Sequence, residues 1–315
     1  MNGALLIRKE SGITSFGVID ALKRHLRDAH GIKSKDLPKL GHGGTLDPFA
    51  TGLLIVLVGR GVKLARYFLG ATKGYEGLIK FGETTVPGDP TSPITETSEV
   101  IPRSLEEIQI LATKFTLQPY LQTPPMHSAK KVNGKPLYEL AREGIEIERE
   151  PKLCHLYDFK INEYQAPKAQ FQLKCSSGTY VRTLSQDLGR LAGSVALLET
   201  LNRTQSGVFR NTNSWSLEEI IKADQSGHKW DQLSCWVPFD ELLKGYPSAE
   251  ASAAEHQSLL QGKQAVLFSI LKRTTNPIER SSEQSDDCVA IYNSQRLIAI
   301  ARKAEEQWGL ERVLT

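Results

Sequence analysis

A single acidic residue, Asp47, separates a basic, glycine-rich segment from an aliphatic run in KLGHGGTLDPFATGLLIVLVGR, residues 39–60. The following proline fixes extended backbone at the aspartate, and the glycines let the main chain approach a ligand or make a tight turn. In an isolated Asp-Pro pair, the carboxylate more often accepts backbone hydrogen bonds in a turn. The density of special residues in this loop favours the alternative, in which Asp47 is a nucleophile.

A carboxylate nucleophile must be ionised, so in a pocket that excludes water it needs a cation beside it. Arg182, in SGTYVRTLSQDLG, is the best candidate, because arginine stays charged and can hold a carboxylate through two donors. A solvent-exposed arginine at a helix start is an equal alternative. Tyr75, in TKGYEG, is either a core aromatic residue of a strand or a ring that stacks on an unpaired base.

Metal and phosphate sites are not indicated by the spacing of the candidate ligands. His42 is more simply a surface histidine than a metal ligand, because His42 and Asp47 have no third ligand nearby. The four cysteines are scattered without C-x-x-C spacing, which indicates neither zinc nor a disulfide framework. GHGGTLD and GRGVK lack the spacing of phosphate-binding loops. We therefore expect no metal and no cofactor.

The elements that must position these residues follow from hydrophobic spacing. An N-terminal strand leads through a turn into an amphipathic helix with Ser15 as its N-cap. Residues 52–59 predict a buried strand, and residues 73–82 alternate as a second strand. Residues 169–193 run from a strand through a Ser-Ser-Gly turn into a helix. Residues 84–99, rich in Pro, Gly, Ser and Thr, predict a loop.

The chain of 315 residues suits one large domain followed by a small one. The composition changes near residues 215–240, and residues 286–303 read as a β-hairpin that turns at 293–295. We therefore predict a catalytic domain over 1–239 and a small β-rich domain over 240–315. The polar segment 273–287 is expected to be a loop.

The net charge of +3 conceals an asymmetry along the chain. Residues 1–80 carry 13 basic and 6 acidic side chains, a net +7, whereas residues 216–315 carry 11 and 15, a net −4. A basic N-terminal third is typical of a protein that binds a polyanion, although an ordinary solvated surface would look the same. The N-terminus does not resemble a signal peptide, and the longest apolar run is too short for a bilayer. A cytoplasmic location is expected.

Taken together, these motifs resemble the TruB-type tRNA pseudouridine synthases, a family that converts uridine 55 of the tRNA T loop. GHGGTLDPFATGLL resembles the family's aspartate motif, and KGYEGLIKFG, TPPMHSAKKVNGKPLYELAREGIEIERE, SSGTYVRTLSQDLG and LETLNRTQSGVF follow in the family's order. The resemblance covers residues 3–240, and the tail is more loosely similar to the family's PUA-like domain. It implies an α+β fold: a mixed, largely antiparallel sheet flanked by helices, then a small C-terminal PUA-like β domain.

The resemblance also implies roles for individual residues. Asp47 matches the aspartate that attacks the target nucleotide, so that the base detaches, turns and rejoins through carbon. Tyr75 matches the tyrosine that stacks on the flipped base and takes part in a proton transfer at the sugar, and Arg182 matches the partner of the aspartate. His42 matches the histidine that enters the space left by the flipped uridine. Lesser contacts with substrate are expected from Lys63, Tyr180, Leu201 and Lys130, and phosphate contacts from lysines 33, 35, 39, 130 and 131.

The sequence departs from the family's pattern at several positions outside the nucleophile, tyrosine and arginine. Glu10 replaces a common proline, and Arg60 stands where a carboxylate is usual. The loop around Val86 lacks a Thr-Asp pair that often begins it, although Asp89 fits a later position. His127 stands where tyrosine is common. These departures concern the thumb-like loop and the finer substrate contacts.

The leading hypothesis is a stand-alone isomerase that acts on the tRNA T arm as a monomer, without a membrane or an obligatory protein partner. A non-catalytic tRNA-binding or folding factor is the alternative from another class. It would need the basic surface and the stacking aromatic residues but not Asp47 with Arg182. A third hypothesis is a pseudouridine synthase of the same fold that depends on guide RNA.

Overall fold

The computed structural model describes residues 1–128, 131–132, 134–276, 287–305 and 307–314. Two features singled out from the sequence lie outside these ranges. They are Lys130 and most of the polar segment 273–287, of which residues 277–286 are not described.

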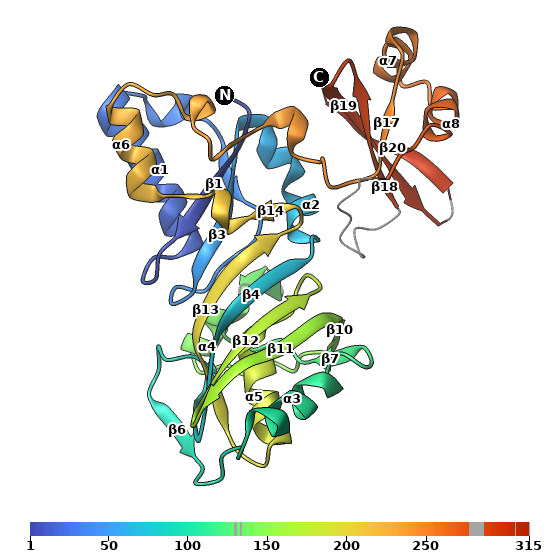
Figure 1. Cartoon of the computed structure of the whole chain (residues 1–315). Coiled ribbons are helices and arrows are strands. Elements are labelled where there is room, and N and C mark those ends of the chain that lie inside the picture. The colour runs from blue at the N-terminus through green and yellow to red at the C-terminus, as the bar shows by residue number, and fades with distance from the viewer. Residues whose placement is uncertain (129–130, 133, 277–286, 306, 315) are drawn as a thin grey trace.

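A mixed, largely antiparallel sheet organises the first three quarters of the chain (Figure 1). Its strands run in the order β11-β12-β4-β13-β3-β1-β15, with β2 beside β3, β14 beside β13 and β16 beside β1. Among the described strands of this sheet, only β13 with β3 and β1 with β15 pair in parallel. The strands are β1 (Gly3–Lys9), β2 (Leu40–His42), β3 (Thr51–Val58), β4 (Lys73–Phe81), β11 (Leu156–Gln165), β12 (Lys168–Cys175), β13 (Ala196–Ser206), β14 (Phe209–Arg210), β15 (Trp215–Ser216) and β16 (Trp236–Pro238).

Helices cover the sheet in two groups. Near β1 lie α1 (Ser15–His30) and α6 (Leu217–Gln225), and near β11 and β13 lie α3 (Leu105–Lys114) and α5 (Val181–Leu191) (Figure 1). β3 is buried from Gly52 to Val58 because it lies between paired strands and under helices, which is why its sequence is uninterruptedly aliphatic. β12 alternates exposed and buried residues along its whole length, as a strand with one solvated face does.

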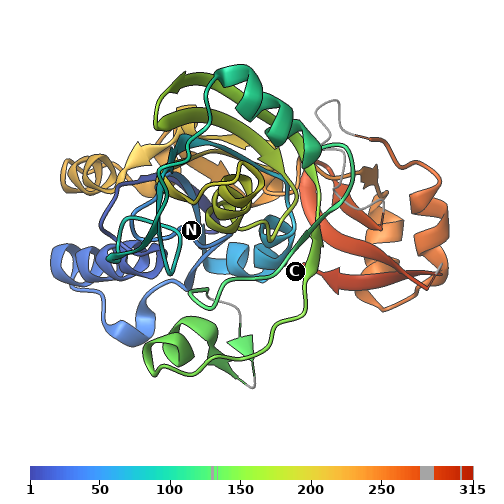
Figure 2. The same cartoon turned by 90° about the horizontal axis from the view of Figure 1, so that it is seen from below.

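Smaller elements border the sheet. Figure 2 shows α4 (Leu137–Arg142) standing away from it, on the same side as β8 (Lys131–Val132) and β9 (Lys135–Pro136). β7 (Tyr120–Gln122) pairs with β10 (Lys152–Cys154), and β5 (Glu83–Thr85) with β6 (Ile94–Thr97). Short turns of 3-10 helix lie at Ser34–Asp36, Gly59–Leu64, Asn211–Asn213, Trp230–Gln232 and Phe239–Glu241, and α2 spans Ala65–Leu69.

Two local predictions were wrong. Residues 84–99 are not entirely a loop, because β6 forms within them and pairs with β5. Ser15 is not the N-cap of α1. Thr14 caps the helix by accepting a hydrogen bond from Gly17 N, while the Ser15 hydroxyl contacts the backbone of Leu46. Both residues are good cap types, and the tertiary contact of Ser15 decided between them.

The C-terminal part forms a second sheet in the order β17-β18-β19-β20, with a hydrophobic core of its own. Its elements are β17 (Ser248–Glu250), α7 (Ala253–Leu260), α8 (Ala265–Leu271), β18 (Cys288–Asn293), β19 (Arg296–Ala304) and β20 (Gln307–Val313). The predicted hairpin is β18–β19, whose two-residue turn holds Ser294 and Gln295 at positive φ. The 239/240 boundary falls in the 3-10 turn Phe239–Glu241 and stays a prediction.

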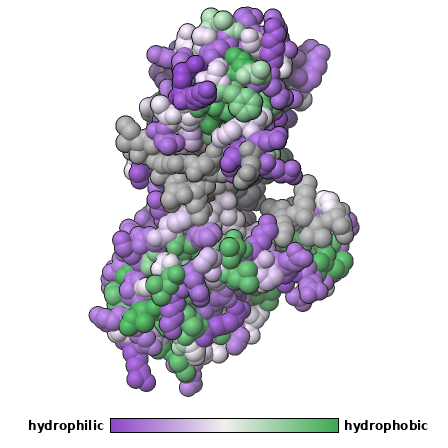
Figure 3. All heavy atoms as spheres, turned by 90° about the vertical axis from the view of Figure 1, so that its right-hand side faces the viewer, coloured by the Kyte–Doolittle hydropathy of each residue, from purple (hydrophilic) through white to green (hydrophobic). Residues whose placement is uncertain are grey.

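The predicted α+β fold with a mixed sheet and a small C-terminal β unit is confirmed. Hydrophilic and hydrophobic side chains are interspersed on the face that Figure 3 shows. No helix among the described residues is both long and apolar enough to cross a bilayer.

Candidate active site

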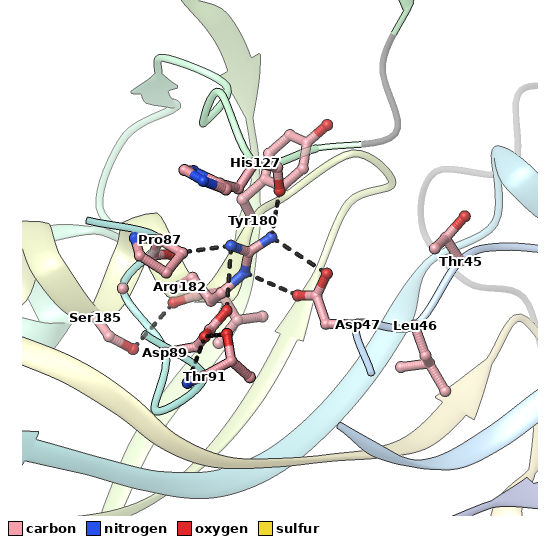
Figure 4. Close-up of polar contacts among 12 residues, drawn as sticks. Thr45, Leu46, Asp47, Pro87, Asp89, Thr91, His127, Tyr180, Arg182 and Ser185 are labelled. Carbon is pink, nitrogen blue, oxygen red and sulfur yellow. Dashed lines mark hydrogen bonds and ion pairs between the residues drawn. The ribbon is translucent and has the colours of Figure 1, made fainter. Parts of the chain in front are cut away.

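Asp47 and Arg182, 135 residues apart in sequence, form a two-point ion pair. Arg182 Nε donates to Asp47 Oδ2 at 2.8 Å, and Nη2 donates to Oδ1 at 3.2 Å (Figure 4). Charge-assisted pairs of this fork geometry are among the strongest hydrogen bonds in proteins. The Asp47 side chain remains 32% exposed, whereas Arg182 is 4% exposed. The arginine is therefore a buried support, and the carboxylate can meet a ligand.

The remaining donors of Arg182 are also fixed. Nη1 donates to Pro87 O at 2.9 Å and lies 3.3 Å from Asp89 Oδ2, and Nη2 donates to His127 O at 2.7 Å. Asp89 is itself held by Thr91, whose backbone N donates to Asp89 Oδ1 at 3.0 Å (Figure 4). These contacts fix the direction of the guanidinium, so the Asp47 carboxylate has one preferred position.

The loop that carries Asp47, residues 43–50 between β2 and β3, is called the aspartate loop here. Ser15 at the start of α1 bonds both backbone groups of Leu46, from Leu46 N at 2.8 Å and to Leu46 O at 3.1 Å. Buried Lys9 donates to Pro48 O at 3.1 Å. Gly44 has φ +143, a value that side chains rarely allow. The backbone on both sides of Asp47 is thus tied to β1 and α1.

Arg203 on β13 ties the same loop from the other side. Its fully buried guanidinium donates to Leu53 O at 2.7 Å, Gly44 O at 3.1 Å and Thr45 O at 3.2 Å. It also hydrogen-bonds the hydroxyl of Tyr75 on β4. One arginine therefore links the aspartate loop to the strand that carries the candidate stacking tyrosine.

These groups line one cleft with a volume of about 690 Å³. Asp47, Tyr75 and Arg182 converge there, as the sequence predicted, and Tyr180 and Leu201 lie in its wall. Backbone contacts fix Tyr180, since its N donates to Gln122 Oε1 at 2.7 Å. Among the other lining residues are Leu46, Lys73, Ser128, Lys152, Gly178, Thr179 and Arg203.

Burial governs the acid–base properties of the cleft. It raises the pKa of Asp47, and the guanidinium of Arg182 opposes that rise. Burial raises the pKa of Tyr75 to about 12, so the phenol stays protonated well above neutral pH. Burial lowers the pKa of Lys73 to about 7 and that of Lys9 to about 8. The cleft thus offers a carboxylate backed by arginine, beside a protonated phenol.

Comparisons with known proteins agree with this geometry. A model of the N-terminal domain of the TruB family of pseudouridylate synthases matches residues 30–181. A tRNA pseudouridine synthase B from Opitutus terrae is 38% identical over 220 residues, covering 70% of this chain and 87% of the relative. The chain belongs to the TruB family of pseudouridine synthases. Another tRNA pseudouridine synthase B, from Clostridium novyi, is 39% identical to this family member over 83% of the chain and 84% of the relative.

The fold of this TruB family member recurs in solved structures. A chain of a Cbf5-Nop10-Gar1 complex superposes with a TM-score of 0.70 at 20% identity, covering 99% of this chain and 84% of that one. A chain of an H/ACA RNP bound to a substrate RNA containing 2'-deoxyuridine gives 0.66, also at 20% identity. At these identities the likeness shows the fold alone, including the small C-terminal sheet.

Of the other predicted site residues, two that the structure describes do not line the cleft. His42, on β2, accepts a hydrogen bond at Nδ1 from Gly44 N at 3.4 Å, and burial lowers its pKa. Lys63 is exposed on the 3-10 turn after β3, where its carbonyl accepts a hydrogen bond from Arg312 of β20. Lys130 lies outside the described residues. The roles expected for all three stay predictions.

Several cleft residues were missed from the sequence. Lys73 precedes Tyr75 by two positions, so both face the same side of β4, and period-two spacing could have revealed it. Arg203 gave no comparable signal, because a charged residue in a strand is normally read as solvated. The contact of Asp89 with Arg182 depends on a loop whose path the sequence does not define.

Proposed function

We propose that this chain isomerises uridine 55 in the T loop of tRNA to pseudouridine. Its family consists of pseudouridine synthases, and its curated relatives act on tRNA, so the chain is a tRNA pseudouridine synthase. The observation that carries the finer proposal is the two-point Asp47–Arg182 pair in a cleft that also contains Tyr75.

The target base must leave its stack before the glycosidic bond can be reached, at a cost of roughly a few kcal/mol. The cleft volume of about 690 Å³ lies in the range of sites that enclose a small organic molecule. A flipped nucleoside therefore fits between Asp47 and the walls formed by Tyr180 and Leu201.

Asp47 then acts as the nucleophile on the target nucleotide. A carboxylate oxygen of Asp47 bonds to C1′ as the N1–C1′ bond breaks, the base turns, and C5 then bonds to C1′ as the bond between Asp47 and C1′ breaks. A proton leaves C5 and N1 gains one, so the atoms balance within the nucleotide and water without a redox partner. Arg182 favours the ionised form of Asp47 and keeps it aimed at the sugar.

Tyr75 stacks on the flipped base, and its hydroxyl takes part in a proton transfer at the sugar in which the proton leaves and returns, so that the sugar is unchanged. Its hydroxyl is protonated at neutral pH, and a hydrogen bond with Arg203 fixes the position of that hydroxyl. His42 would fill the space that the base leaves. Lys63 and Lys130 would contact the RNA.

The protein would work in the cytoplasm as a monomer, without an obligatory protein or guide-RNA partner. A tRNA-binding or folding role is a second candidate, favoured by the basic N-terminal third. Such a role does not require Asp47 or its ion pair, which gives an experimental distinction.

The decisive variant is Asp47→Asn, with Asp36→Asn as the control because Asp36 is exposed near the same basic loop. The proposal expects Asp47→Asn to abolish pseudouridine formation in a tRNA transcript. It expects tRNA binding within about tenfold, roughly 1.4 kcal/mol, of the parent protein. Retained activity would disprove the nucleophile.

The modified position is tested separately with purified protein and bare tRNA transcripts. Pseudouridine mapping should find one product at position 55, and a transcript with cytidine there should stay unmodified. A product elsewhere would reject the proposed position, and no product at any salt concentration would reject autonomy. Complementation by Asp47→Ala of a strain that lacks the modification would favour the binding factor.

A further inference from the structure

Three side chains of metal-ligand type meet where α1 and α6 pack together, and none of them lines the cleft. His25 and His30 lie near the end of α1, and Asp224 lies near the end of α6. The Nε2 atoms of the two imidazoles lie 2.6 and 2.5 Å from the same oxygen, Asp224 Oδ2. Among the described residues, no other group of three His, Cys, Asp or Glu side chains converges within 4.8 Å in this way.

Two imidazole nitrogens and one carboxylate oxygen form a donor set that suits Zn²⁺, with bonds of about 2.0–2.2 Å. A tetrahedral ion with such bonds holds its ligand atoms about 3.3 Å apart. The two N···O distances would therefore have to open by about 0.7 Å. His30 can open its own distance to Asp224, because it is the last residue of α1 and is followed by Gly31 in the left-handed conformation. A rotation of the Asp224 carboxylate about its terminal torsion can open the distance to His25.

Two of the three side chains are buried, and the third is exposed to solvent. His25 is 7% exposed and Asp224 is 9% exposed, so packing holds them in place. His30 is 43% exposed, which leaves a path for an ion and room for a water molecule as fourth ligand. A metal site needs preorganised ligands and an entry path, and this cluster offers both.

We propose that His25, His30 and Asp224 bind one Zn²⁺ ion that joins α1 to α6. The ion would not contact the RNA. It would stabilise α1, whose first residue, Ser15, holds Leu46 next to the nucleophile. The ion is therefore expected to raise the Tm of the protein by stabilising the helix that holds the aspartate loop. The rival arrangement is a carboxylate that only accepts hydrogen bonds from two imidazoles.

Zinc binding is measured on the full chain after treatment with a chelator and dialysis. Calorimetric titration with ZnCl₂ near neutral pH should give one ion bound per chain. Thermal unfolding should give a higher Tm with the ion than without it. Co²⁺ should give the visible absorption of a tetrahedral N/O site. The four cysteines do not compete, because all are buried and burial raises the pKa of each thiol.

Two variants assign the site without disturbing the buried histidine. His30→Gln and Asp224→Asn should each weaken Zn²⁺ binding at least tenfold and remove the zinc-dependent rise in Tm. His256→Gln, the same change in α7 of the C-terminal unit, should bind zinc like the parent chain. Pseudouridine formation by His30→Gln at low temperature should be unchanged, because the cluster does not touch the cleft.

Failure to bind one equivalent of Zn²⁺ would overturn the proposal and leave the hydrogen-bonded cluster. Unchanged zinc affinity in both His30→Gln and Asp224→Asn would overturn it as well. Circular dichroism confirms that each variant is folded before its affinity is interpreted. None of these outcomes bears on the Asp47 reaction, which is tested by product formation.

Discussion

Two buried arginines line the same cleft in different surroundings. Arg182 is 4% exposed and contacts two carboxylates and two backbone carbonyl groups, those of Asp47, Asp89, Pro87 and His127. Arg203 is 2% exposed and meets three backbone carbonyl groups and the Tyr75 hydroxyl. Arg182 holds the carboxylate of Asp47, which is partly open to a ligand. Arg203 instead fixes the path of the main chain around that residue.

The difference separates two tasks that a catalytic loop requires. Arg182 sets the charge and direction of one reactive group, so its loss should lower mainly the rate of pseudouridine formation. Arg203 holds the backbone around that group, so its loss should lower mainly the free energy of unfolding. Both tasks use arginine because the guanidinium stays charged and presents several donors in one plane.

The largest effect is expected for Arg182→Lys. Lysine keeps the charge but cannot hold Asp47 through two parallel hydrogen bonds. We expect pseudouridine formation to fall by about 100-fold. The free energy of unfolding should fall by only about 1 kcal/mol, because the lysine still places a positive charge between Asp47 and Asp89. Single-turnover rates and urea denaturation measure the two quantities. Arg190→Lys, an exposed position later in α5, is the control, and an unchanged rate in Arg182→Lys would remove the distinction.

Arg203→Met should have the opposite balance. Three carbonyl groups lose their donor, two of them in buried hydrogen bonds, and we expect the free energy of unfolding to fall by about 3 kcal/mol. Urea denaturation gives the value, and Arg210→Met at an exposed position of β14 is the matched control. A variant as stable as the parent but inactive would show that Arg203 serves the chemistry rather than the backbone.

A smaller effect concerns Lys73 in the same cleft and the pH dependence of the free energy of unfolding. Burial lowers the pKa of Lys73 to about 7, whereas an unfolded lysine titrates near about 10.4. Between these values the unfolded chain binds more protons, so this lysine makes the free energy of unfolding rise with pH. Lys73→Met should flatten that rise, as measured by urea denaturation from about pH 7 to pH 9.5.

The comparison for Lys73 is Lys174→Met, at an exposed position of neighbouring β12. That variant should keep the pH dependence of the parent chain. Lys9, whose pKa burial lowers to about 8, acts in the same direction in every variant and cancels from the differences. Equal slopes for the Lys73 variant and the parent would contradict the assignment.

Local pattern predicted much of the framework, and contacts between distant segments account for the errors. The aliphatic run at residues 52–59 became β3, and the hairpin turn at residues 293–295 formed as expected. Ser15 was assigned as a cap because cap preference is local, whereas its bonding to Leu46 depends on a loop 31 residues away. The strand in residues 94–97 was missed because the composition of residues 84–99 is typical of a loop. Hydrogen bonding to β5 makes residues 94–97 a strand.

The sequence by itself determined the kinds of groups available for chemistry: a carboxylate before proline, an arginine at a strand-to-helix junction, and an aromatic residue on an alternating strand. These follow from residue type and short spacing, which the linear chain contains. Only the tertiary structure placed Asp47 against Arg182 and enclosed both with Tyr75 and Arg203 in one cleft. It also brought His25 and His30 to Asp224. Such meetings depend on the packing of whole elements, and no local pattern encodes the distance between them.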